Sequence, residues 1–203
     1  MAIGKPNDYD KIPVGGERLQ PGGHRCVIKQ AEEQTSKNGS QMLVISFDTD
    51  LTDAQPKFYE NRWLSDKRDD KKWGGKMYVV VEGEYGPANL KRFCTAVEDS
   101  NEGFDCWSDK GELKLAELKG KLVGIVFREE EYTAWDGQVR RAVKGFRFCD
   151  YHKATDQSVP DPKPLQQSQE ALDATRPASL PQADDYGFVN VVDGLEDEGL
   201  PFK

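Results

Sequence analysis

The chain has 203 residues, of which 28 are Lys or Arg and 36 are Asp or Glu, so its formal net charge is -8. No apolar run approaches the roughly 18 residues of a transmembrane helix, so no membrane partner is expected. The opening sixteen residues carry two aspartates and no apolar stretch, which excludes a typical secretory signal. Cys26, Cys94, Cys106 and Cys149 lack zinc-finger or Cys-x-x-Cys spacing, which indicates a cytoplasmic protein rather than a disulfide scaffold.

The acidic charge is concentrated in the last fifty residues. Residues 1–153 hold 25 basic and 26 acidic residues, a net of -1, whereas residues 154–203 hold 3 and 10, a net of -7. Because this C-terminal stretch is poor in apolar residues, it cannot offset the entropy of ordering the backbone, roughly 1–2 kcal/mol per residue. We therefore predict a folded domain over 1–153, a disordered linker over 154–185 and an acidic partner-binding tail over 186–203.

The first half of the domain has the pattern of short strands. Lys37-Asn38-Gly39 indicates a tight hairpin turn, since Asn-Gly tolerates a positive φ. Apolar, β-branched and aromatic residues are enriched on both sides of this turn and again after it. The strands expected from these runs cover residues 24–32, 42–48, 57–64 and 76–82, and Phe58 and Tyr59 would then point to opposite faces.

A helix and a second hairpin follow. Pro87 suits the first turn of a helix, and Leu90, Phe93, Cys94 and Val97 repeat at helical spacing. A short helical turn is expected over 113–118. Strands over 122–132 and 139–148 are expected to be joined through Trp135-Asp136-Gly137, because Asp-Gly between two apolar-patterned runs is a strong hairpin signal.

This order of elements predicts a mainly β domain with one or two helices. The OB-fold, a five-stranded Greek-key barrel with a helix between its third and fourth strands, has this order. Other small α+β or β-sandwich folds could also accommodate it. In an OB-fold, the loops between the first two and the last two strands flank the groove that binds oligonucleotides.

Two segments mix basic and aromatic side chains, as suits a single nucleic-acid strand. Lys57–Lys76 holds seven basic and four aromatic residues, and Val139–Arg147 holds four basic residues next to the turn with Trp135. Cations neutralise phosphates, and flat rings stack on bases of any sequence. Alternatively, the rings belong to the core and the charges form a solvated surface. The candidate DNA-binding residues are Tyr59, Arg62, Trp63, Lys67, Arg68, Lys71, Lys72, Trp73, Trp135, Arg140, Arg141 and Lys144.

Motifs for catalysis are missing from the sequence. The two histidines, His24 and His152, have no partner at metal-ligand spacing, and neither a phosphate-binding loop nor a nucleophile elbow is present. Glu129, Glu130 and Glu131 alternate faces on a strand, so they cannot converge on one ion and are expected to form a solvated strand end. We predict a protein that is not an enzyme and uses no metal or cofactor; a metal-dependent nuclease is the enzymatic alternative.

The C-terminus joins an acidic cluster to an apolar tip. A bare acidic tail would only keep the chain in solution. Here a proline restricts the backbone before the aromatic residue, which lowers the ordering cost when the ring enters a pocket, while the acids steer the tip towards a basic surface. The predicted partner-binding residues are Glu196, Asp197, Glu198, Leu200, Pro201 and Phe202.

This tip resembles that of bacterial single-stranded DNA-binding proteins, in which an acidic run ending in Ile-Pro-Phe follows a disordered linker. Leu200 stands at the Ile position and Pro201-Phe202 match the last two residues, whereas Gly199 and Lys203 depart from the pattern. The resemblance implies that the tip recruits replication and recombination proteins such as helicases, polymerases and repair factors.

The folded domain is similar to proteins of bacteriophages and prophages that sit among replication and recombination functions. The similarity rests on Glu17–His24, Cys26–Glu32, Ser36–Gly39 and Met42–Phe47. It implies an OB-fold protein that coats and protects single-stranded DNA without strong sequence preference in the cytoplasm of a bacterial host. Domains of this kind often act as homo-oligomers. An OB-like adaptor that binds proteins but not DNA is the alternative from another class.

Overall fold

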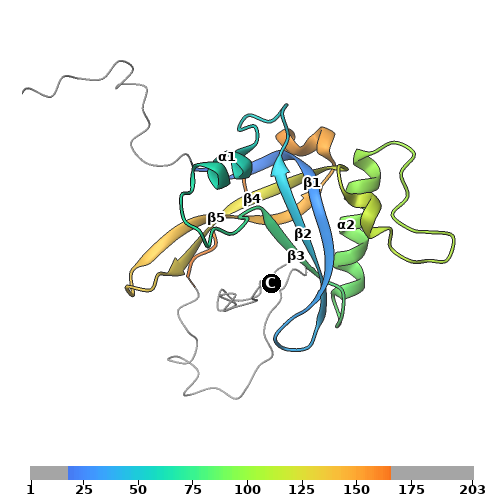
Figure 1. Ribbon diagram of the computed structural model, residues 1–203, viewed down its shortest axis with the longest axis horizontal. Coiled ribbons are helices and arrows are strands. Elements are labelled where there is room, and N and C mark those ends of the chain that lie inside the picture. The colour runs from blue at the N-terminus through green and yellow to red at the C-terminus, as the bar shows by residue number, and fades with distance from the viewer. Residues whose placement is uncertain (1–17, 166–203) are drawn as a thin grey trace, which may run out of the picture.

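The computed structural model describes residues 18–165, which form a five-stranded antiparallel sheet in the order β3-β2-β1-β4-β5 (Figure 1). The predicted mainly β fold class is thus confirmed. Within the described residues, no helix has both the length and the apolar character to cross a membrane. The strands are β1 (Gly22–Thr35), β2 (Gln41–Thr49), β3 (Lys76–Val80), β4 (Leu122–Thr133) and β5 (Val139–Cys149).

Both predicted hairpins are confirmed. β1 pairs with β2 and β4 pairs with β5, each through a tight turn. Gly39 in the first turn has a φ of 85° and Gly137 in the second a φ of 75°, the left-handed conformation that glycine adopts without steric cost. The local Asn-Gly and Asp-Gly signals therefore fix the register of the two longest strand pairs.

One face of the curved sheet encloses the core. Ile28 on β1 stands opposite Phe47 on β2, and both are buried. The rings of Phe47 and Phe127 lie 5.9 Å apart, so β2 and β4 meet across the interior although they are not neighbours in the sheet. Register shifts beside Ile28 and beside Phe127 mark bulges, which sharpen the twist of a sheet.

The sheet is not closed into a continuous barrel. Among the described residues, its edge strands β3 and β5 do not pair with each other. They nevertheless meet at one point, where a Cβ added to Gly145 of β5 would lie 2.6 Å from Sδ of Met77 on β3. Met77 is buried, so its side chain fills the space that the missing Cβ leaves. Side-chain packing rather than a hydrogen-bond ladder joins the two edges.

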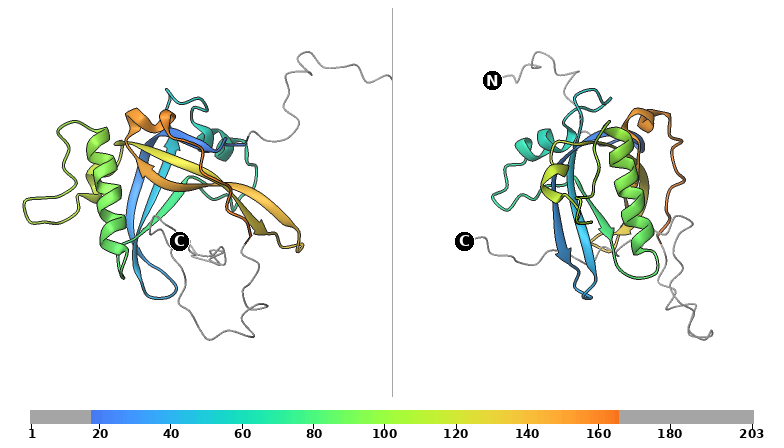
Figure 2. Two further views of the ribbon diagram at one scale, coloured as in Figure 1. Left: turned by 180° about the vertical axis from the view of Figure 1, so that it is seen from behind. Right: turned by 90° about the vertical axis from the view of Figure 1, so that its right-hand side faces the viewer.

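Helix α2 (Gly86–Ser100) confirms the predicted helix. Pro87 lies in its first turn, and Phe93, Cys94 and Val97 are buried against the sheet. Phe93 packs on Phe148 of β5 with ring centroids 4.9 Å apart. Figure 2 shows α2 beside the sheet, on the side away from the tip of the β4–β5 hairpin. The expected short helical turn is also present as η2 (Leu115–Leu118).

The strand predicted over residues 57–64 is wrong, because these residues form helix α1 (Phe58–Ser65). The end of β2 caps this helix. Asp48 accepts hydrogen bonds from the backbone N–H groups of Tyr59 (2.9 Å) and Glu60 (3.1 Å), and the Thr49 hydroxyl accepts one from that of Phe58 (2.8 Å). First-turn N–H groups have no partner inside a helix, so these acceptors favour the helix over a strand. Phe58 and Tyr59, expected on opposite faces, are both buried.

The folded domain extends beyond the boundary expected at residue 153. Helix η3 (Tyr151–Asp156) covers β1 and β4, and a Cβ added to Gly23 would lie 1.7 Å from the carbonyl oxygen of the buried Ala154. Residues 157–165, here called the strap, then run beside β4, where Lys163 bonds through its backbone to Glu129 and Glu131 (2.8 and 3.0 Å). The rest of the expected linker, 166–185, lies outside the described residues.

A buried His24–Asp53 pair ties β1 to the loop before α1. Nδ1 of His24 lies 2.9 Å from Oδ1 of Asp53, and Nε2 lies 2.9 Å from the carbonyl oxygen of Gln20. Because both partners are acceptors, both ring nitrogens donate and the imidazole is a cation. Burial acts to lower the pKa of His24, but the hydrogen bonds to Asp53 and Gln20 and the charge on Asp53 outweigh it and raise the pKa above its usual 6.5.

We expect the stability of the protein to fall as the pH rises above about 6.5, because a raised folded-state pKa contributes stability that is complete below the unfolded value and is lost above the folded one. Urea denaturation at a series of pH values measures this. The dependence should be absent in His24→Gln and kept in His152→Gln, since His152 is exposed. The same pH profile in wild type and His24→Gln would contradict the assignment.

We also expect Asp48→Ala to lower the free energy of unfolding by about 2 kcal/mol, because it leaves two N–H groups of α1 without their acceptor. Helicity measured by circular dichroism should fall with it. Asp69→Ala, which removes an exposed carboxylate further along the same segment, is the control and should leave both quantities unchanged. Equal stability of the two variants would show that α1 does not depend on its cap.

Candidate nucleic-acid interface

Two hairpin arms and one loop frame the candidate interface. In Figure 1 the β1–β2 hairpin extends downwards and the β4–β5 hairpin extends to the left, both beyond the body of the sheet. Helix α1 and the loop over residues 66–75 lie near the other end of β2 and lead into β3. Both basic and aromatic segments that the sequence singled out are therefore on this side of the molecule, away from α2.

The outward faces of β2 and β3 lie between these parts. Leu43, Ile45 and Phe47 point into the core, so Val44 and Ser46 lie on the opposite face of β2, where Val44 is buried and Ser46 partly exposed. Their register partners on β3 are Tyr78 and Lys76. Tyr78 is 47% exposed. Tyr78 was not among the DNA-binding residues expected from the sequence. Its exposure could have been predicted from the alternation of polar and apolar residues over 76–79. This alternation places Tyr78 on the strand face opposite to the buried Met77 and Val79.

Trp63 and Lys71 are the two candidates that the structure brings into direct contact. Nζ of Lys71 lies 3.9 Å from the centre of the Trp63 ring, a cation–π contact. Trp63 is 38% exposed on α1, while Lys71 also donates to the backbone oxygen of Asp66 at 3.3 Å. A cation held against a ring face suits a nucleotide, whose phosphate and base need the two groups side by side.

Tyr59 is wrong as a stacking candidate. Its ring is buried and packs edge-on against Phe47 and Phe58, with centroids 5.4 and 5.1 Å apart. Burial raises the pKa of its hydroxyl well above 10. Tyr59 is a core residue, which is the alternative that the sequence left open for these rings.

Trp73 also serves the fold. Its indole N–H lies within hydrogen-bond distance of the carbonyl oxygens of Phe47 (3.0 Å) and Gly75 (3.1 Å), and the ring is partly buried against the core. These contacts hold the loop over residues 66–75 on the end of β2. The loop that carries Lys71 and Lys72 therefore has a fixed position because of Trp73.

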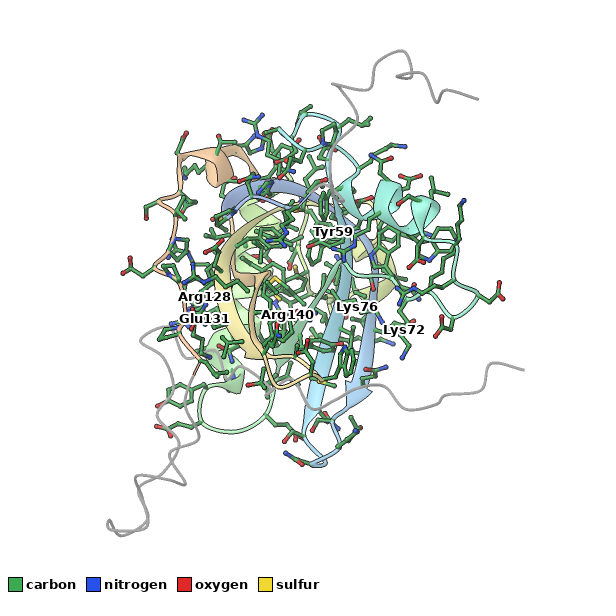
Figure 3. The ribbon with its side chains drawn as sticks, turned by 90° about the vertical axis from the view of Figure 1, so that its left-hand side faces the viewer. Tyr59, Lys72, Lys76, Arg128, Glu131 and Arg140 are labelled. Atoms are coloured by element: carbon green, nitrogen blue, oxygen red, sulfur yellow. The ribbon has the colours of Figure 1, made fainter. Side chains whose placement is uncertain are left out.

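Trp135 is the most exposed aromatic side chain described, at 95%. It occupies the tip of the β4–β5 hairpin, where Asp136 pairs with Arg140. Arg141, further along β5, donates to Glu131 at 3.1 Å and lies 3.9 Å from Glu129. In Figure 3 Arg140 lies between Lys76 and Lys72 on one side and Arg128 and Glu131 on the other.

Several of the predicted phosphate ligands are already paired with carboxylates. Arg68 lies 2.7 Å from Asp66 and holds the pKa of that carboxyl at about 2. Arg140 and Arg141 have the partners given above. Ion pairs between exposed side chains are weak because solvent screens them, so a phosphate can replace the carboxylate at small cost.

The three glutamates of β4 are not the solvated strand end expected. Glu130 is buried, and its Oε1 accepts a hydrogen bond from Nε of the equally buried Arg128 at 2.9 Å. The Arg128 guanidinium also lies over the Phe146 ring at 4.2 Å. The strap runs beside this part of β4, so Arg128 is a structural cation rather than a ligand for DNA.

The predicted DNA-binding residues fall into three groups by exposure. Tyr59 is buried, and Lys71, Trp73 and Lys144 are partly buried. The exposed ones are Arg62, Trp63, Lys67, Arg68, Lys72, Trp135, Arg140 and Arg141. Over residues 18–165, no cluster of three or more His, Cys, Asp or Glu side chains could hold a metal ion. The predicted partner-binding residues 196–202 lie outside the described part of the chain.

No model of a known protein family matches the chain, and no curated protein matches it.

We expect Trp73→Phe to lower the free energy of unfolding by about 1 kcal/mol, because it removes a buried donor from two carbonyl groups. Trp135→Phe is the matched control and should leave stability unchanged, since its ring is almost fully in solvent. Urea denaturation of the two variants measures the difference. A larger loss for Trp135→Phe would mean that the hairpin tip is packed.

Proposed function

We propose that the chain is a phage-type single-stranded DNA-binding protein with an OB-fold body. It coats and protects single-stranded DNA during replication and recombination without strong sequence preference. One observation carries the proposal: exposed aromatic rings and basic side chains occur together on two separate elements on the same side of the sheet. The first is the Trp63–Lys71 contact at α1, and the second is the β4–β5 hairpin tip, which carries the exposed Trp135 and the Asp136–Arg140 ion pair.

The strand order supports the OB-fold. The fold is a five-stranded Greek-key barrel that can be partly open, with β1 between β2 and β4 and a helix between β3 and β4. The sheet here has the order β3-β2-β1-β4-β5, and α2 follows β3. Contact of Met77 with Gly145 brings the two edge strands together without pairing them. In such a fold the β2–β3 surface with Tyr78 and the two hairpin loops form the oligonucleotide groove.

Binding would combine stacking with exchange of ion pairs. Trp135, Trp63 and Tyr78 offer ring faces to unstacked bases, each worth about 1–3 kcal/mol. Arg140 and Arg141 would pass from their carboxylate partners to phosphates. Each phosphate neutralised on a single strand contributes about -0.7 to the slope of log affinity against log salt, so binding should weaken with salt.

The acidic tip would add a second activity. Residues 196–202 would recruit DNA-processing proteins, and the roughly thirty residues between Leu165 and the tip would give it reach. This part of the proposal rests on the sequence, on its acidic run and its apolar end.

Anisotropy of a labelled oligo-dT titrated with the full chain tests the proposal. We expect saturable binding that weakens with salt, and weaker binding to duplex DNA. Trp135→Ala should bind about 5- to 150-fold more weakly, which corresponds to one lost stacking contact of about 1–3 kcal/mol. Trp107→Ala is the matched control, because Trp107 is 38% exposed on the loop that follows α2, on the far side of the molecule (Figure 2).

Each other outcome has a definite meaning. No binding at low salt would overturn the proposal and favour the adaptor that binds proteins only. Cleavage of the labelled strand in magnesium or manganese would favour the nuclease. If Trp135→Ala binds as tightly as the wild type, the DNA site does not include the tip of the β4–β5 hairpin.

A further inference from the structure

Two thiols lie together on the side of the molecule that the proposed DNA site does not use. Cys94 is on α2, and Cys106 is on the loop that follows the helix; neither is in a disulfide. Sγ of Cys106 lies 3.7 Å from the carbonyl oxygen of Cys94. Figure 1 shows this helix and loop on the right, opposite the tip of the β4–β5 hairpin.

Both thiols are buried, but only Cys94 lines a groove that opens to solvent. A groove of about 740 Å³ runs between α2 and the loop, lined by Leu90, Cys94, Phe104 and Trp107 among others. Cys94 contributes to its wall, whereas Cys106 is fully buried behind it. A small solute in the groove therefore meets Cys94 first.

The backbone around Cys106 is held in place. Its N–H donates to Oε1 of Glu98 on α2 at 3.0 Å, and its carbonyl oxygen accepts from the N–H of Lys114 at 2.9 Å. Across the loop, Trp107 pairs with Leu113 in a short β-bridge. Cys106 thus stays beside α2 without relying on its side chain.

A hydrogen bond between the two thiols also gives them different acidities. The hydrogen bond from Cys106 lowers the pKa of Cys94 below its usual 9.0, although burial and the carboxylates of Glu98 and Asp105 oppose this. The same contact, together with burial, raises the pKa of Cys106. A thiolate is the reactive form of cysteine, so Cys94 is the nucleophile of the pair.

We propose that Cys94 and Cys106 form a reversible disulfide when the protein meets hydrogen peroxide. The Cys94 thiolate attacks one peroxide oxygen, the O–O bond breaks, and the departing hydroxide takes up a proton to leave as water. Cys94 is then a sulfenic acid. The sulfur of Cys106 attacks the Cys94 sulfur, the S–O bond breaks, and the hydroxide leaves as water with the Cys106 proton. Two thiols and one peroxide give one disulfide and two waters.

The disulfide would join α2 to the groove wall that carries Phe104 and Trp107. It closes a short loop, since the two cysteines are 12 positions apart. A closed loop restricts the unfolded chain and slows opening of the segment that it spans. The width of the groove would then depend on the state of the thiols.

The other two cysteines are poor competitors for peroxide. Cys26 is fully buried, and burial raises its pKa well above 9. Cys149 is partly exposed, but burial raises its pKa to about 11. Both stay protonated at neutral pH, so oxidation should be confined to the pair.

Peptide mapping of the full chain after treatment with hydrogen peroxide tests the proposal. Trypsin leaves both cysteines in one peptide, residues 93–110, because Arg92 and Lys110 are the flanking cleavage sites. We expect this peptide to lose about 2 Da, the two hydrogens released by a disulfide. Further cleavage at Glu98 or Glu102 should leave its two halves linked until a reductant is added. Thiol titration in denaturant should fall from four groups to two.

Cys106→Ala should abolish the 2 Da loss, and Cys149→Ala is the matched control that should keep it. A gain of about 32 Da on residues 93–110 would overturn the proposal, because it marks a sulfinic acid and no disulfide. Disulfide-linked dimers of the chain would overturn it too. If Cys106→Ala fails to fold, the map of the wild-type chain still decides. The result does not depend on whether the protein binds DNA.

Discussion

The cap that β2 supplies to α1 decides where the basic and aromatic segment lies. The side chains of Asp48 and Thr49 accept hydrogen bonds from three N–H groups of the first helical turn. Without these acceptors the N–H groups would lack partners, and a helix after residue 57 would not be favoured over a strand. Once the helix forms, Phe58 and Tyr59 enter the core while Trp63 stays at the surface. The Trp63–Lys71 contact, on which the proposed function partly rests, thus depends on two polar side chains at the end of a neighbouring strand.

Elements of the fold could be predicted from the sequence where the interactions that form them join residues close together in the chain. The two hairpins and α2 depend on turn residues and on periodic apolar positions within a few residues of each other, so they were predicted correctly. α1 was not, because Asp48 acts across eleven and twelve positions on a segment without a clear local pattern. The fold of residues 154–165 was missed because the fit of Ala154 in η3 against Gly23 and the backbone hydrogen bonds of the strap hold it, and neither leaves an apolar signal.

The exposure of the candidate site residues could likewise be predicted only where it depends on local structure. Trp135 could be predicted because the tip of a two-stranded arm is exposed whatever the rest of the fold does. Exposure of Tyr59 and Trp73 depends on how α1 and its loop return to β2, so composition alone misassigned them to the surface. Glu130 was misassigned in the same direction, since it was expected in solvent but is buried with Arg128 where the strap runs beside β4. Each error lies where a distant segment of the chain covers a residue.

The pairing of cations with carboxylates shapes how such a surface can bind. A bare row of arginines would attract any polyanion, whereas here Arg68, Arg140 and Arg141 each begin with a carboxylate partner. When a phosphate replaces the carboxylate beside one of these arginines, the net electrostatic gain is the difference between two similar ion pairs. If the surface binds DNA as proposed, affinity would come mainly from ring faces, which double-stranded DNA, with its bases stacked inside, cannot use. The near-neutral charge of residues 1–153 and the exposed aromatic residues would then give the proposed protein a physical basis for preferring single strands.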